Sequence, residues 1–162
     1  MSLSVHIRKK LGDFQLAVDL EHPGGITGLL GASGCGKSMT LKAIAGIEKP
    51  DEGRIVLDGR VLFDSEKKIN LKPQDRKVGY LFQNYALFPN MTVEKNILCG
   101  LSAEKDRGMR KKKMEDMLEK MDLSEQRKLY PAQLSGGQQQ RTALARMLVP
   151  DAGQRTGSPF TG

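Results

Sequence analysis

A glycine-rich segment in the first quarter of the chain constrains the fold more than any other feature. Residues 31–38 read Gly-Ala-Ser-Gly-Cys-Gly-Lys-Ser, a full match to the pattern G-x-x-x-x-G-K-[ST]. Such a loop binds phosphate when it joins a strand to a helix, because backbone N–H groups then converge on one point. The short apolar run at 26–30 predicts this strand, buried on both faces as in a parallel sheet. The segment 40–47, which Pro50 and Gly53 end, predicts the helix.

Each residue type in this loop has a physical reason. Gly31, Gly34 and Gly36 permit a tight turn and the close approach of phosphate oxygens. Lys37 adds a positive charge for the β- and γ-phosphates, and the Ser38 hydroxyl can ligate Mg²⁺. The loop therefore predicts a nucleotide-phosphate site, which leaves GTPases, kinases and many ATPases as candidates.

A second motif lies about a hundred residues further along the chain. It consists of Leu134, Ser135, Gly136, Gly137 and Gln138. Ser135 can cap a helix over 138–148, and the two glycines leave the first N–H groups of that helix open to an anion. Read by itself, the motif is equally well a capped helix start. Together with the upstream loop, and with Gln83 at the end of a predicted strand at 78–82, it resembles the signature motif of ATP-binding cassette ATPases.

The resemblance implies an α/β fold, a P-loop NTPase of the ABC type. It has a parallel-sheet core, an antiparallel β subdomain and a helical signature subdomain. It also implies ATP and Mg²⁺ as ligands, with Ser38 and Gln83 at the metal and Gln83 near the attacking water. The residues that it places at the nucleotide are Gly31, Ala32, Ser33, Gly34, Cys35, Gly36, Lys37, Ser38 and Met39. In this family two subunits associate head to tail, so that the signature motif of one contacts the ATP of the other.

The remaining pattern fits this architecture. Alternating apolar residues predict strands at 3–8 and 14–20 around a Gly-Asp turn, and a hairpin at 54–63 with Asp-Gly at its turn. We therefore expect a partial ABC domain over 1–150, with the β subdomain and P-loop core at 1–83 and the helical subdomain at about 84–150. The polar stretch 151–162 resembles an unrelated tail.

Within the family, residues 53–64, 76–83 and 87–89 are similar to importer ATPases for molybdate and related oxyanions. This likeness implies integral-membrane permease subunits as partners and a peripheral position on the cytoplasmic face of the membrane. The residues expected to form an apolar groove for the permease are Tyr85, Leu87, Phe88 and Met91. Internal packing is an equally good interpretation for some of them.

The sequence departs from the family pattern at several points. Met39 stands where a Ser or Thr usually contacts the α-phosphate, and Phe14 suits either stacking on adenine or core packing. After Val149 the family continues into an apolar strand that ends in Asp-Glu, and a histidine follows; neither is present in these 162 residues. We therefore expect a truncated chain that lacks the C-terminal part of the core and the general base. It should bind ATP without efficient hydrolysis.

Composition limits the alternatives. The chain is 38% hydrophobic and 28% charged, contains two cysteines, and has no apolar run long enough to span a membrane, which favours one cytosolic domain. Part of its net charge of +7 lies at 107–113, ahead of the helical apolar stripe Met114, Met117, Leu118 and Met121. We interpret these cations as a solvated helix face, with no nucleic acid as partner.

Two functions remain open besides import: a non-catalytic nucleotide-binding module, and an ABC-type ATPase outside transport. The latter usually carries a long coiled coil, which is absent from these 162 residues.

Overall fold

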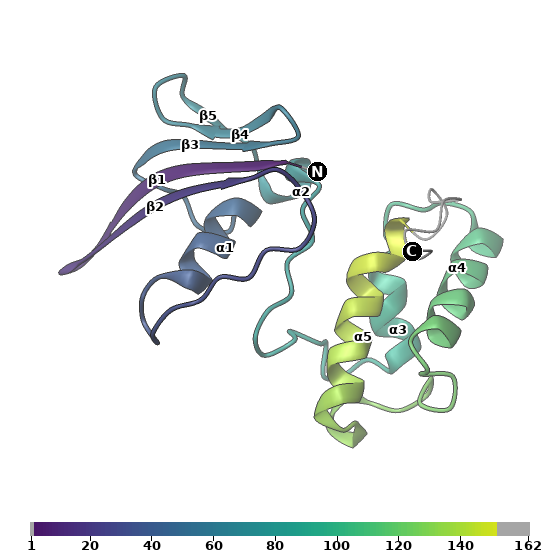
Figure 1. Cartoon of the computed structure of the whole chain (residues 1–162). Helices are drawn as coiled ribbons and strands as arrows, with labels where there is room; N and C mark the ends of the chain where they lie inside the picture. Colours follow the sequence, from purple (N-terminus) through teal and green to yellow (C-terminus); the bar gives the residue numbers. More distant parts are fainter. Residues whose placement is uncertain (1, 152–162) are drawn as a thin grey trace. The chain divides into compact units, whose positions relative to one another are not determined.

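The computed structural model describes residues 2–151 and divides the chain into two compact units, Met1–Tyr80 and Leu81–Gly162 (Figure 1). The first unit contains β1 (Leu3–Leu11), β2 (Phe14–His22), α1 (Lys37–Ala45), β3 (Glu52–Leu57), β4 (Arg60–Asp64), β5 (Ile69–Asn70) and α2 (Pro73–Arg76). The second contains α3 (Val93–Cys99), α4 (Arg107–Lys120), η1 (Pro131–Gln133), α5 (Gly136–Leu148) and η2 (Val149–Asp151). Among the described helices, none is both long enough and apolar enough to cross a membrane. Apart from its first residue, the predicted tail 151–162 lies outside the described residues.

The first unit is an antiparallel sheet in the order β2-β1-β3-β4-β5, with α1 against one face (Figure 1). Both predicted hairpins are confirmed: β1 and β2 pair up to Leu11 and Phe14, and β3 joins β4 through Asp58 and Gly59. The φ angles of Asp58 and Gly59 are 49° and 75°, as the turn type favoured in two-residue hairpins requires. The core between sheet and helix consists of Val5, Ile7, Ala43, Ile44, Ile55, Leu62 and Phe63.

Two predicted strands, the one expected in a parallel sheet at 26–30 and the apolar one at 78–82, are wrong for the described structure. Residues 26–30 and 78–82 have no strand conformation, and every pairing among the described residues is antiparallel. Ile26 and Leu30, which were expected to be buried, are 102% and 97% exposed. A strand persists only where a neighbouring strand pairs with its backbone, and no described segment pairs with either run.

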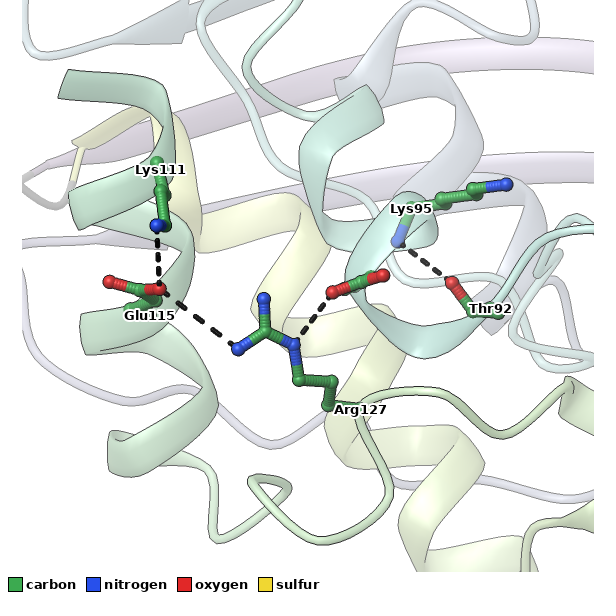
Figure 2. A network of polar contacts seen from close by, with 6 residues as sticks. Thr92, Lys95, Lys111, Glu115 and Arg127 are labelled. Carbon is green, nitrogen blue, oxygen red and sulfur yellow. Dashed lines mark hydrogen bonds and ion pairs between the residues drawn. The ribbon is translucent and has the colours of Figure 1, made fainter. Parts of the chain in front are cut away.

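The second unit is helical, with α3 packed against α4 and α5. The apolar stripe predicted for α4 is confirmed, since Met114, Met117 and Leu118 are buried. Polar contacts fix the surroundings of α3: the Thr92 hydroxyl accepts from the Lys95 N–H at 3.4 Å. Figure 2 shows this cap beside the ion pairs of Arg127, which follows α4 in the chain.

Candidate nucleotide-binding site

The glycine-rich loop leads directly into α1, as the sequence predicts, although the helix begins at Lys37 and not at residue 40. Gly36 caps this helix with a φ of 94°, in the left-handed region that favours glycine. No side chain caps the first turn, and that turn contains no acidic residue. The N–H groups at the positive end of the helix dipole are therefore available to an anion.

The side chain of Lys37 folds back over the loop. Its ammonium group donates to the carbonyl oxygens of Gly31 at 2.6 Å and Ala32 at 2.7 Å, and lies 3.5 Å from the sulfur of Cys35. A cation, an uncapped helix start and exposed loop residues are thus gathered in one place. The Lys37 ammonium and the open N–H groups of the helix start suit a phosphate group, because the first is positively charged and the second carry partial positive charge.

Phe14, the candidate for stacking on adenine, lies next to this loop. A Cβ atom built on Gly36 would clash with Leu16 and would lie 3.8 Å from the ring of Phe14. Only glycine therefore fits at position 36 without displacing its neighbours. Phe14 is 42% exposed, so core packing is not its role in the described structure. Ser38 is exposed, whereas Met39 is half-buried.

The second motif begins α5 in the way predicted. The Ser135 hydroxyl accepts from the N–H of Gln138 at 3.3 Å, and the Gln138 side chain accepts from the N–H of Ser135 at 2.9 Å. This reciprocal pair is a capping box, which fixes the first turn of the helix. Gly136 and Gly137 are exposed, and a Cβ on either would meet open space. Leu134 is buried in the core of the second unit.

Gln83 is exposed and begins a turn over 83–86 in the second unit. Tyr85 and Ala86 in this turn have φ angles of 60° and 45°, which are uncommon for residues with a side chain. Phe88 is 46% exposed. Of the other residues expected to contact a permease, Tyr85, Leu87 and Met91 are half-buried. The structure thus supports internal packing for part of this set and exposure for Phe88.

Two residues that the sequence analysis missed hold this turn and the segment that follows it. Asn96 on α3 is fully buried; its side chain accepts from the N–H of Phe88 at 2.9 Å and donates to the carbonyl oxygens of Phe88, Met91 and Thr92. Arg146 on α5 donates to the carbonyl oxygen of Tyr85 at 3.1 Å, and its guanidinium carbon lies 5.2 Å from the centre of the Phe88 ring. Burial lowers the pKa of Arg146. Nothing in the sequence singles out either residue, because both read as ordinary polar residues of a helix.

A third missed residue, Arg76, belongs to the first unit. Its guanidinium is buried and donates to the carbonyl oxygens of Ala43 and Ile44, in the last turn of α1, at 2.7 and 2.9 Å. It also donates to Leu71 O and Asn70 Oδ1, both at 2.9 Å. The helix that carries the glycine-rich loop is thereby fixed at its opposite end.

Comparison with known proteins agrees with these features. The family model described as ABC transporter matches residues 15–153. A probable sulfate/thiosulfate import ATP-binding protein, CysA of Chlorella vulgaris, is 48% identical over 148 residues, which is 89% of this chain and 60% of that protein. The molybdenum import ATP-binding protein ModC of Aliivibrio fischeri is 41% identical over 150 residues, or 92% of this chain and 40% of that protein. The chain thus spans about half the length of these curated relatives.

Solved structures give the same result for the fold. A dimeric bacterial ABC transporter cassette superposes with a TM-score of 0.71 at 27% identity, covering 93% of this chain and 70% of that one. A dimeric ATP-binding cassette in a post-hydrolysis state, bound to ADP and Pi, gives a TM-score of 0.69 at 26% identity with the same coverage. The predicted fold class is therefore confirmed, even though the strands predicted at 26–30 and 78–82 are not formed.

Proposed function

The chain belongs to the ABC transporter family, and we propose that it is the ATP-binding part of a membrane importer. The observation that carries this proposal is the loop at α1, where the Lys37 ammonium and an uncapped helix start lie together. ATP would replace the two loop carbonyls as the partner of Lys37. The exposed Ser38 hydroxyl would hold Mg²⁺, which neutralises phosphate charge when bound.

We extend the proposal to the other residues at the nucleotide. Phe14, exposed beside Gly36, would stack on adenine. Gln83 would orient water near the metal. The open N–H groups of Gly136 and Gly137 would contact the ATP held by a second copy of the chain, in a head-to-tail dimer. The dimeric state of the similar cassettes supports this arrangement.

The proposed cargo is an oxyanion such as molybdate or sulfate. Its support is that the similar proteins are import ATP-binding proteins for sulfate/thiosulfate, molybdenum and, in Archaeoglobus fulgidus, molybdate/tungstate. The permease would contact the segment after Gln83 through Phe88, which is exposed, and such a contact would hold the chain at the cytoplasmic face of the membrane. By itself, this 162-residue chain should bind ATP with little hydrolysis. No group in it is matched to the family's general base, which commonly contributes about 10²–10⁴ in rate.

Substitution of Lys37 tests the nucleotide site. Loss of a charge-assisted phosphate contact costs about 1.5–3 kcal/mol, so Lys37→Ala should weaken Mg-ATP binding about tenfold to a hundredfold in a calorimetric titration. Lys42→Ala, on the same helix but outside the loop, is the matched control and should leave affinity unchanged. Equal affinities for the parent chain and Lys37→Ala would refute the assignment of the loop.

A further inference from the structure

The first half of α4 carries an excess of positive charge that the described structure does not neutralise. Residues 104–113 contain six cationic side chains and two carboxylates. Lys113 pairs with Glu104 at 3.4 Å, and Lys111 lies 4.0 Å from Glu115, as Figure 2 shows for the second pair. Among the residues that the structure describes, no carboxylate lies within ion-pair distance of the other four, which are Lys105, Arg107, Arg110 and Lys112.

This charge arrangement does not favour the helix itself. The N-terminal end of a helix is the positive end of its dipole, which favours acidic residues. The N-cap Asp106 meets this preference, since its carboxylate accepts from the N–H of Met109 at 2.6 Å, but the first turn that follows has no acidic residue and contains Arg107 and Arg110. The acidic residues of α4 lie in its second half instead, at the negative end. One carboxylate at the cap does not balance the cations of residues 105–113, and this excess of positive charge favours contact with an anion.

The same stretch also presents an apolar side chain. Met109 is 47% exposed and shares a helix face with Lys112, three residues later, while Met114, Met117 and Leu118 hold the opposite face of α4 in the core. Exposed cations around an apolar side chain are typical of segments that lie on anionic lipid surfaces. Residues 101–113 contain no aromatic residue, and base stacking on aromatic rings is the usual means of holding single-stranded nucleic acid.

We propose that the start of α4, with Lys105, Arg107, Met109 and Lys112, is a contact surface for the anionic headgroups of a lipid bilayer. The choice of a membrane over other polyanions rests in part on the proposed function in import, which brings the chain to a membrane. The nucleotide loop takes no part in this contact.

Sedimentation with vesicles tests the surface. The full chain is mixed with vesicles of phosphatidylcholine alone or with phosphatidylserine added, in parallel for the parent and for the triple variant Lys105→Gln, Arg107→Gln, Lys112→Gln. Binding of the parent should require phosphatidylserine and disappear at about 1 M salt, where screening acts within about 3 Å. The triple variant should bind about a hundredfold more weakly, roughly fivefold for each cation removed. Its melting temperature should not fall, because removal of Arg107 relieves an unfavourable contact with the helix dipole.

A second triple variant separates position from net charge. Lys49→Gln, Lys67→Gln and Lys128→Gln remove the same charge at exposed positions outside residues 104–113 and should leave vesicle binding within a few-fold of the parent. Equal losses in the two triple variants, absence of parent binding to phosphatidylserine vesicles, or tighter binding to a single-stranded oligonucleotide than to vesicles would each overturn the proposal. Lys37→Ala should retain vesicle binding, so failure of the ATP site and failure of this surface are distinguishable.

Discussion

Replacement of Arg76 by methionine should lower the free energy of unfolding by about 3–5 kcal/mol. The side chain is 1% exposed and donates four hydrogen bonds of 2.7–2.9 Å. Methionine fills a comparable volume but donates none of them. The acceptors, which include two carbonyl oxygens in the last turn of α1, would remain in the interior without this donor.

The magnitude follows from two opposing effects. A buried acceptor without a partner costs about 1–3 kcal/mol, although Ala43 O keeps another bond, from the Gly46 N–H at 3.2 Å. Against this, methionine carries no charge that must be removed from water. Burial of the guanidinium charge of Arg76 is unfavourable, and the same effect lowers the pKa of Arg76. The loss of hydrogen bonds prevails, because a carbonyl left without a donor gains no water in a closed core.

Urea denaturation followed by circular dichroism measures the effect. Arg76→Lys keeps the charge but cannot reach all four acceptors, so it should lose about half as much. Arg60→Met removes an exposed arginine at the start of β4 and should change stability by less than about 0.5 kcal/mol. A loss for Arg76→Met no larger than that of Arg60→Met would show that the buried hydrogen bonds do not hold α1.

Three smaller predictions concern other contacts. His6 on β1 contacts Glu21 and Asp19 at 2.7 and 3.0 Å, and chiefly the hydrogen bond to Glu21 raises its pKa above 6.5. The contribution of this contact to stability is therefore full below pH 6.5 and is lost as the pH rises through the raised pKa of His6. The urea midpoint of the parent should fall over that pH range, whereas the midpoint of His6→Gln should not. Arg146→Ala should speed hydrogen exchange in the turn over 83–86 but not in α4, and equal exchange there would contradict the contact. Ser135→Ala should cost about 0.5–2 kcal/mol in a urea titration, whereas Ser135→Asp should cost little.

Features that depend on neighbouring residues were predictable from the sequence. The turn at Asp58-Gly59 sets its own hairpin, because both residues accept positive φ and their strands are adjacent in the chain. The start of α5 was equally local, since the capping residue and its partner are three positions apart. The phosphate loop also needs only its own glycines and lysine, together with the helix that follows.

Features that depend on distant partners were not predictable in the same way. The apolar run at 26–30 indicates burial, but composition does not say which strand pairs with it, and the described residues provide none. Arg76, Asn96 and Arg146 have the opposite problem. Each reads as an ordinary polar residue, and only the tertiary structure shows that its side chain satisfies carbonyl groups from other segments.

The contacts of Arg146 connect the helix that begins at the signature residues with the turn after Gln83. Tyr85 and Ala86 occupy backbone conformations that cost about 1–3 kcal/mol each, and such conformations persist only where the surroundings impose them. Here Asn96 on α3 donates to the carbonyl oxygen of Phe88, just after the turn. Arg146 donates to the carbonyl oxygen of Tyr85 from α5, the helix that begins at the signature residues. A displacement of α5 must therefore carry this turn with it or break the 3.1 Å hydrogen bond and the contact with Phe88. If the signature contacts a second subunit's ATP and Phe88 contacts a permease, as proposed, these two surfaces are linked through one side chain.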